Sequence, residues 1–247
     1  MSFKSCIKNS RLFKKVFYFK TIDSTNDHAF RISSRYRNNF IVVADKQTDG
    51  RGRFNRIWFS PARENIYFSL FIQEPVLDHN DLSILTAQTM LKVLQSYKRS
   101  LQIKWPNDII CDQKKVSGLL IENQVSQGRI QASVIGVGIN CFTNFLRIGE
   151  LKGRAVSLRD LTDKPLSREK IFNDCVSLFE KQYLDFSSCR KQVFADWKKN
   201  IAYLHDTVTI KAGSAVYSGV LKRVNRDGSI LLADGRIRHK LTFGEMA

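Results

Sequence analysis

Residues 65–72, with the sequence Asn-Ile-Tyr-Phe-Ser-Leu-Phe-Ile, are nearly all apolar and strongly restrict the folds open to this chain. Such a run is typical of a β-strand that is covered on both faces. A strand of this kind belongs inside a sheet, because water on either face would leave its apolar side chains exposed. We therefore expect a β-sheet with helices packed against it.

A loop rich in glycine and arginine, Asp49–Trp58, lies between this strand and an earlier apolar run at 40–44 that is also predicted to be extended. Glycines allow backbone N–H groups to approach a ligand closely. Arginine side chains present planar sets of donors to carboxylate or phosphate oxygens. The loop is therefore suited to hold an anion, although a solvated basic turn would have the same composition.

A polar segment, Thr21–Asp27, follows a short predicted strand at 16–20. Ser24 or Thr25 is suited to cap a helix through about residue 36, because their hydroxyls accept hydrogen bonds from the free N–H groups of a first helical turn. Alternatively, the same hydroxyls lie against a ligand at the helix N-terminus. Further helices are predicted from apolar spacing at 78–97, 167–185 and 189–200.

Segment 102–122 is predicted to form two strands joined by a polar turn at 112–113. Pro106 lacks a backbone donor, so the first strand should end or bulge there. Gly118 lies inside the second strand, where a missing side chain often marks the close approach of a ligand or another backbone. Lys115 precedes this glycine by three residues.

A further strand at 130–140 ends in Gly-Val-Gly-Ile-Asn. It lacks the third glycine of a dinucleotide-binding fingerprint and ends rather than opens an α/β unit, so we discount that interpretation. From residue 206 the chain changes to short strands at 207–210, 216–224, 230–232 and 237–241, separated by glycine-containing turns. This spacing predicts a small antiparallel barrel. We expect a basic arm at 1–15, a main domain at 16–202 and the barrel at 203–247.

The composition limits the function classes. A net charge of +17 favours anionic partners such as nucleic acid, nucleotides or an acidic protein surface. The five cysteines and four histidines show no metal-ligand spacing, which favours reduced thiols in a cytosolic protein and no structural zinc. No apolar run approaches the roughly 20 residues that a membrane span needs.

Five stretches together resemble the biotin protein ligases, also called biotin–[acetyl-CoA-carboxylase] ligases. They occur in family order at plausible spacing: Ser24-Thr25-Asn26, Gly50–Trp58, Lys104–Asp108, Lys115–Gly118 and Gly136–Asn140. The resemblance covers residue 17 to the C-terminus. It implies an α+β fold, in which a mixed sheet flanked by helices is followed by a small SH3-like barrel. Only about fifteen residues precede the first predicted strand, so we expect the monofunctional type, without the N-terminal DNA-binding domain of bifunctional relatives.

The family's reaction explains the residue types. Such ligases join the biotin carboxylate to ATP, which gives biotinyl-5′-AMP and pyrophosphate, and a lysine of a biotin carboxyl carrier protein of acetyl-CoA carboxylase then displaces AMP. Two anions must be held together, which requires fixed positive charge more than an acid–base pair. The resemblance implies that the protein uses ATP and a Mg²⁺ ion that ATP carries, and we assign no protein ligands to this metal. We expect a cytoplasmic location, no association with a membrane and a possible homodimer.

The resemblance also implies roles for individual residues. Lys115, Arg51 and Arg53 are expected to act on the reacting groups, with Lys115 remaining protonated and stabilising the transition state. The residues expected to bind biotin are Ser24, Thr25, Asn26, Gln47, Gly50, Arg51, Gly52, Arg53, Lys115 and Gly118. Those expected to bind the nucleotide are Arg53, Arg56, Trp58, Asn107, Lys115 and Asn140.

Several of these roles have structural alternatives. Lys115 is alternatively a surface lysine that flanks a turn. Trp58 either covers the adenine or packs in the core. Asn107 and Asn140 contact the nucleotide or its Mg²⁺, whereas Asp108 either serves the metal shell or holds its turn.

The chain departs from the family at Asn55, where the loop usually has glycine. Asparagine tolerates a positive φ better than other non-glycine residues. The turn is therefore expected to survive, with an effect on retention of the adenylate rather than on binding.

Two other functions compete with biotin ligation. A lipoate ligase or octanoyltransferase shares the same architecture, but the Gly-Arg-Gly-Arg loop and the Lys-Trp-Pro-Asn-Asp motif at 104–108 favour biotin. A basic nucleic-acid-binding protein would explain the charge. It leaves the placement of Lys115 and Gly118 unexplained.

Overall fold

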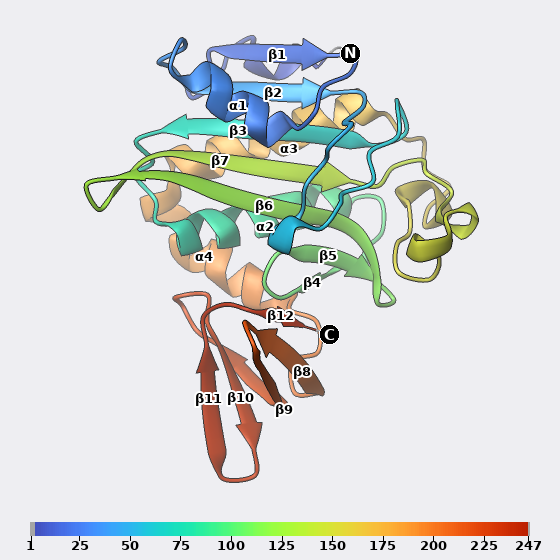
Figure 1. Ribbon diagram of the computed structural model, residues 1–247, viewed down its shortest axis with the longest axis vertical. Coiled ribbons are helices and arrows are strands. Elements are labelled where there is room, and N and C mark those ends of the chain that lie inside the picture. Colours follow the sequence, from blue (N-terminus) through green and yellow to red (C-terminus); the bar gives the residue numbers. More distant parts are fainter. Residues whose placement is uncertain (1–2, 247) are drawn as a thin grey trace.

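The computed structural model describes residues 3–246, which form two β-sheets with helices around the larger one (Figure 1). The larger sheet has seven strands in the order β1-β2-β3-β7-β6-β5-β4. Strand β1 (Lys15–Phe19) pairs in parallel with β2 (Phe40–Ala44), and the other neighbours pair antiparallel. The predicted mixed sheet is thus confirmed.

The apolar run at 65–72 forms the interior strand β3 (Ile66–Gln73), which is buried at every position except Gln73. It lies between β2 and β7 (Arg129–Ile139), so its backbone N–H and C=O groups form hydrogen bonds with a neighbouring strand on each side. The rest of the sheet consists of β4 (Gln102–Lys104), β5 (Asp108–Cys111) and β6 (Lys114–Ser126).

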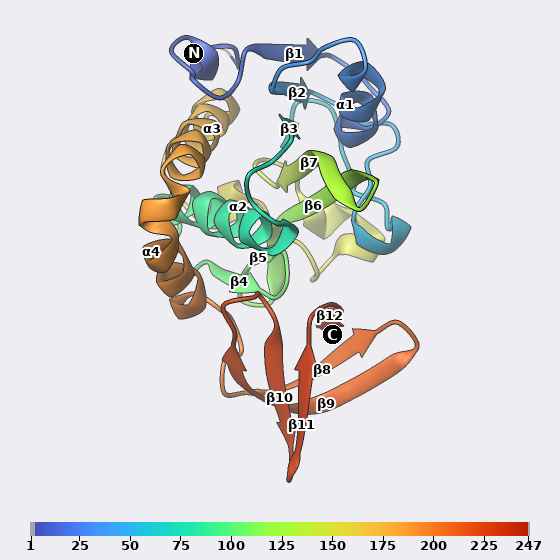
Figure 2. The same cartoon turned by 90° about the vertical axis from the view of Figure 1, so that its left-hand side faces the viewer.

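Helices cover both faces of this sheet (Figure 2). Helix α1 (Thr25–Ser33) lies on one face, and α2 (His79–Leu94), α3 (Arg168–Leu184) and α4 (Phe186–Lys199) lie on the other. The alternation of strand side chains sets this division: Phe40 and Val42 pack toward α1, whereas Ile41 and Val43 join the large core under the other helices. The predicted cap of α1 is confirmed, because the Ser24 side chain accepts a hydrogen bond from the backbone N–H of Asp27.

The first strand of segment 102–122 ends just before Pro106, as predicted, but a further strand that was not expected precedes the turn at 112–113. Strand β4 ends at Lys104, the chain reverses over 105–107, and β5 pairs antiparallel with β4. The proline lacks the donor that a continuous strand would need. The reversal places Lys104 directly opposite Asp108 in the register of the hairpin.

The second sheet has five antiparallel strands in the order β11-β10-β9-β8-β12. Its strands are β8 (Thr207–Ala212), β9 (Ala215–Val224), β10 (Ile230–Asp234), β11 (Ile237–Leu241) and β12 (Glu245–Met246). The first four match the sequence prediction, whereas β12 was not predicted. The indole N–H of Trp105 donates to the carbonyl of Gly228 at 2.8 Å, so the turn between β4 and β5 contacts the turn between β9 and β10.

Short 3-10 helices complete the described chain, at Ser5–Ile7, Arg53–Asn55, Phe145–Arg147, Gly149–Leu151 and Leu158–Asp160. The described part of the expected arm packs on α3, where Glu180 accepts hydrogen bonds from the backbone N–H groups of Arg11 and Leu12. Met1, Ser2 and Ala247, which belong to the outer two predicted segments, lie outside the described residues. The domain boundary near residue 203 falls between α4 and β8 and stays a prediction.

Within residues 3–246, no helix has the length and apolar character that crossing a lipid bilayer requires.

Candidate active site

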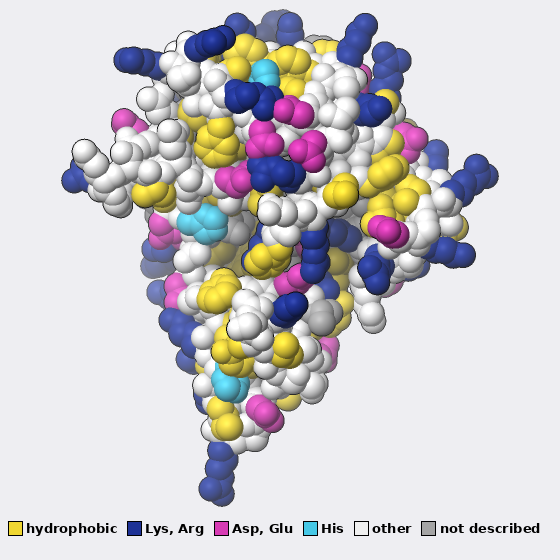
Figure 3. All heavy atoms as spheres, viewed as in Figure 1, with side chains coloured by type: hydrophobic (Ala, Val, Ile, Leu, Met, Phe, Trp, Pro, Cys, Tyr) yellow, Lys and Arg dark blue, Asp and Glu magenta, His cyan; other side chains and the backbone are white. Residues whose placement is uncertain are grey.

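A cavity of about 620 Å³ opens where the glycine-rich loop, the β4–β5 hairpin, β6, β7 and the C-terminal strand β12 meet. Figure 3 shows a hollow between the main body and the smaller sheet, with Lys and Arg side chains inside it. A cavity of this size suits a small organic ligand. The predicted site residues that line it are Ser24, Thr25, Asn26, Gln47, Arg51, Gly52, Arg53, Arg56, Trp58, Asn107, Lys115, Gly118 and Asn140.

One end of the cavity is a buried network of neutral polar groups. Gln47 Oε1 accepts hydrogen bonds from the backbone N–H and the hydroxyl of Thr25, at 2.8 and 3.1 Å. Ser69, fully buried on β3, lies 2.8 Å from the Thr25 hydroxyl and 2.6 Å from Asn26 Oδ1. The network fixes the orientation of Thr25 and Asn26, so this end presents donors and acceptors in set directions.

Glycines on two neighbouring strands make room for the side chains of the site. A Cβ at Gly136 would lie 2.4 Å from Asn26 Oδ1, and one at Gly138 would lie 2.3 Å from Trp58 Cε2. At Gly118 a Cβ would lie 2.8 Å from both Lys115 Cε and Trp58 Cζ3. The close approach predicted at Gly118 therefore comes from side chains of the site itself.

Gly50 does not line the cavity among the described residues. A Cβ there would lie 2.6 Å from both the Trp58 carbonyl and Ser60 Oγ. This glycine lets the two ends of the loop pack together, and its predicted contact with biotin stays a prediction.

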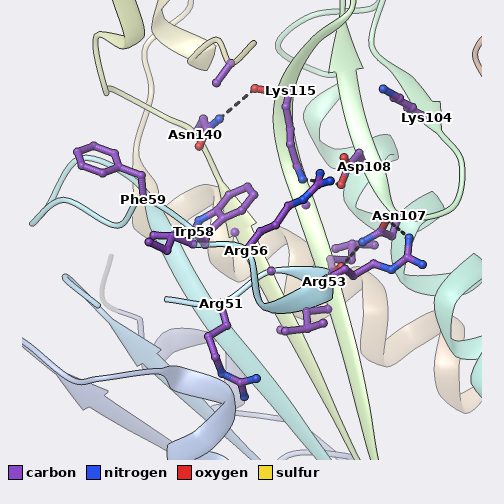
Figure 4. A pocket seen from close by; sticks show the side chains of 18 of the residues that line it. Arg51, Arg53, Arg56, Trp58, Phe59, Lys104, Asn107, Asp108, Lys115 and Asn140 are labelled. Carbon is purple, nitrogen blue, oxygen red and sulfur yellow. Dashed lines mark hydrogen bonds and ion pairs between the residues drawn. The ribbon is translucent and has the colours of Figure 1, made fainter. Parts of the chain in front are cut away.

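Two cations of the site, Lys115 and Arg51, have carboxylate counter-ions from the protein. The Lys115 ammonium lies 2.8 Å from Asp108 Oδ1 and 5.1 Å from the centre of a Trp58 ring. The Arg51 guanidinium bonds Asp27, an interaction that raises the pKa of the arginine, and lies 3.3 Å from Glu122. In Figure 4, Lys115 points from β6 toward Asp108, whereas Arg51 lies on the opposite side of the loop and points away from them. The site thus holds two separate positive centres.

The predicted nucleotide residues of the loop contact the chain end. Arg53 donates to Asn107 Oδ1 at 3.3 Å and to the carbonyl of Gly244 at 3.0 Å, and burial lowers the pKa of its guanidinium. Arg56 forms an ion pair with Glu245 on β12. Sequence reasoning did not foresee these contacts, because β12 is only two residues long and lies 189 positions from Arg56.

The loop backbone adopts the conformation that the sequence required of Asn55. Both Phe54 and Asn55 have φ near +56°. Asparagine is among the non-glycine residues that tolerate this region best. The glycine usual at this position is therefore replaced without loss of the turn.

The far wall of the cavity was not predicted. It comes from the irregular segment after β7 and includes Phe145, Leu151 and Ala155. Asn140 connects this wall to β6, because its side-chain amide donates to the Lys115 carbonyl at 3.0 Å. No periodic pattern marks this segment in the sequence. The paired glycines at 136 and 138 were the available signal for a site at this strand end.

Comparisons with known proteins agree with this geometry. Residues 18–140 match the biotin/lipoate A/B protein ligase family. The chain is 31% identical over 185 residues to the bifunctional ligase/repressor BirA of Bacillus spizizenii, covering 73% of this chain and 57% of that protein. It is 27% identical over 223 residues to the biotin–[acetyl-CoA-carboxylase] ligase of Paracoccus denitrificans, covering 85% of this chain and 90% of that protein.

The structure resembles the biotin protein ligase from Aquifex aeolicus in complex with biotin and ATP, with a TM-score of 0.82 and 26% identity. The match covers 95% of this chain and 98% of the Aquifex chain. The chain spans less than two thirds of the two Bacillus BirA proteins, yet nearly all of the Paracoccus and Aquifex ligases. The sequence and the fold therefore agree that the chain belongs to the biotin/lipoate A/B protein ligase family, alongside the biotin protein ligases.

Proposed function

We propose that this chain activates biotin with ATP to biotinyl-5′-AMP and transfers biotin to a lysine of a biotin carboxyl carrier protein of acetyl-CoA carboxylase. One observation carries the proposal: a single cavity joins a buried end of neutral polar groups to Lys115 and the loop arginines. Biotin has the same division, with a polar ureido ring at one end and a carboxylate at the other. The similarity to ligases named for biotin supports this assignment.

In the first step a biotin carboxylate oxygen attacks the α-phosphorus of ATP. The new P–O bond forms as the bond to the bridging oxygen breaks, and pyrophosphate leaves with the electron pair. Lys115, Arg51 and Arg53 offset the negative charge of the two reactants. The ion pairs of Lys115 with Asp108 and of Arg51 with Asp27 hold these cations in place beforehand. Such preorganised charge needs no reorganisation during the reaction.

In the second step the neutral amine of the carrier lysine attacks the biotinyl carbonyl carbon, and AMP leaves. The mixed anhydride must be kept from water until the carrier arrives. The loop at 49–58 is suited to this task, because it borders the cavity and contains two exposed apolar side chains, Phe54 and Ile57. Closure of this loop over the adenylate is part of the proposal.

Magnesium fits this site as an ion brought by ATP. No group of three or more His, Cys, Asp and Glu side chains within residues 3–246 is arranged to hold a metal. Asp108 and Glu245 are carboxylates on the cavity wall, and phosphate oxygens and water would complete the oxygen shell that Mg²⁺ prefers. The ion would neutralise phosphate charge.

The polar end favours biotin over lipoate or octanoate. The buried side chains of Thr25 and Asn26 and the partly buried side chain of Gln47 would face an apolar tail if either of those acids were bound. Each hydrogen bond that the ureido ring adds to these groups would contribute about 0.5–1.5 kcal/mol, and an apolar tail would add none.

We also propose a cytoplasmic location and an acidic carrier partner. If the chain forms a homodimer by pairing sheet edges, β1 and β4 are the edges that the large sheet offers. The function does not require the dimer.

Pyrophosphate exchange into ATP tests the proposed reaction. The purified protein would be given Mg²⁺ and one of four conditions: biotin, lipoate, octanoate or no acid. We expect exchange with biotin alone and at least a ~100-fold loss in Lys115→Ala. Lys114→Ala is the matched control, because this neighbouring lysine is exposed and does not line the cavity. Exchange with lipoate would overturn the substrate, and no exchange by folded protein with any acid would overturn the activity.

A further inference from the structure

A carboxylate lies directly behind the neutral polar end of the cavity. Glu122 does not line the cavity among the described residues, yet its Oε2 accepts a hydrogen bond from Asn26 Nδ2 at 2.7 Å. Because strand residues alternate between faces, Gly118, Leu120 and Glu122 lie on the same face of β6. The first two line the cavity, and Glu122 is the next residue in that row.

The contact with Glu122 fixes which way the Asn26 amide points. A carboxylate offers acceptors only, so the NH2 group of the amide faces it, and the same group also donates to the carbonyl of Leu120 at 3.3 Å. The amide oxygen, Oδ1, therefore faces the Ser69 hydroxyl, 2.6 Å away, and the space above Gly136. An amide oxygen can accept two hydrogen bonds and Ser69 uses one, so the other position can serve a ligand in the cavity.

Glu122 also contacts the glycine-rich loop. Its Oε1 lies 3.3 Å from the guanidinium of Arg51, which also pairs with Asp27. Among the residues that the structure describes, no other side chain forms hydrogen bonds with both Asn26 and Arg51. Asp27 shares Arg51 with Glu122, but it forms no side-chain hydrogen bond with Asn26. The contact with Asn26 therefore distinguishes Glu122 from a simple counter-ion of the loop.

We propose that Glu122 is a positioning residue that makes the cavity selective for an acid with an N–H donor at its far end. It acts through Asn26, whose amide it holds so that Oδ1 accepts a hydrogen bond from a ureido N–H of biotin. This inference rests on the proposed ligase function and deepens its substrate specificity. The tails of lipoate and octanoate carry no N–H group, so they gain nothing from an acceptor in this position.

Calorimetric titration with biotin, in the absence of ATP, tests this role. Glutamine has the size of glutamate but is neutral and can donate as well as accept, so in Glu122→Gln it holds the Asn26 amide less firmly. We expect the Kd for biotin to rise about 10-fold. Glu74→Gln is the matched control, because it makes the same change at an exposed carboxylate that does not line the cavity. An unchanged Kd in Glu122→Gln would overturn the proposal.

A double-mutant cycle tests whether Glu122 acts through Asn26. Asn26→Asp alone sets two carboxylates against each other, so the Kd for biotin should rise at least ~10-fold. In the double variant Asn26→Asp/Glu122→Gln, a donor and an acceptor again face each other, with the amide and the carboxylate exchanged. Its Kd should be at least ~10-fold lower than the product of the two single effects predicts. Single effects that simply multiply would overturn the action of Glu122 through Asn26.

Exchange kinetics separate this role from support of Arg51 or of the fold. At saturating biotin, the kcat of pyrophosphate exchange by Glu122→Gln should stay within about threefold of the unmodified protein, because Asp27 still pairs with Arg51. The KM for biotin should rise with the Kd. A fall in kcat at unchanged KM would contradict the proposal. Failure of the ligase assignment itself would look different, because the unmodified protein would then not bind biotin.

Discussion

At the scale of single residues, Trp58 depends on glycines that lie far from it in sequence. Its ring occupies the space above Gly118 and Gly138, on two adjacent strands of the sheet. The same ring lies under the Lys115 ammonium. A tryptophan in this position forms part of the cavity floor rather than of the apolar core, and its contact with the adenine stays a prediction.

Gly138→Ala should displace Trp58, because the added Cβ would lie 2.3 Å from the ring. Since a rigid indole has little room to adjust, we expect kcat/KM for ATP in the exchange reaction to fall at least ~10-fold, with a change in tryptophan fluorescence. Gly149→Ala is the matched control, since nothing lies within 4 Å of a Cβ added there. Unchanged kinetics and fluorescence in Gly138→Ala would show that Trp58 does not require this glycine.

At the scale of elements, the glycine-rich loop is held at both ends and strained in the middle. Backbone hydrogen bonds join Gly50 to Trp58 and Gly52 to Arg56, so the loop closes on itself as a compact turn. Its tip contains the two residues with positive φ, Phe54 and Asn55. Strain at such a tip costs roughly 1–3 kcal/mol, and it makes the tip sensitive to the type of side chain.

Asn55→Ile should weaken retention of biotinyl-5′-AMP, because a β-branched residue disfavours a φ of +56° and would open the turn. We expect the adenylate to dissociate about 10-fold faster, measured by trapping released biotinyl-5′-AMP in the absence of carrier. Asn55→Gly is the control, since glycine adopts this conformation freely and should hold the adenylate at least as long as asparagine. Equal dissociation from the Ile and Gly variants would mean that the turn does not govern retention.

At the scale of the whole molecule, the net charge of +17 acts beyond the cavity. Fields from such a charge speed the encounter with acidic partners and are screened within about 8 Å at physiological salt. They have less influence on small ligands held by direct contacts inside the cavity. The charge is therefore expected to affect the second step of the reaction more than the first.

Biotinylation of an acidic carrier domain should lose at least ~10-fold in kcat/KM between low salt and 0.5 M NaCl, since screening removes the steering. Pyrophosphate exchange under the same conditions should change by less than about threefold, which provides the internal control. Equal salt dependence of both steps would argue against steering. Tight, salt-sensitive binding to DNA in a mobility-shift assay would support the nucleic-acid function considered from composition.

Local sequence patterns determined much of the fold and the identity of many candidate residues. The apolar run became the interior strand β3, Ser24 caps α1, and the strand before Pro106 ends at Lys104. These features depend on the periodicity of apolar side chains, on helix capping and on the backbone N–H that proline lacks. All three are properties of residues close together in the sequence. The five family stretches also supplied many of the lining residues, because each is a short contiguous motif.

Only the tertiary structure decided which distant residues complete the site. Ser69 meets Thr25 across 44 positions, and Arg56 meets Glu245 across 189. No local pattern encodes such pairs, because they depend on strand order, on the β4–β5 reversal and on the docking of the smaller sheet. The sequence thus determined which chemical groups this protein carries, whereas the packing of its two sheets decided which of them face one another.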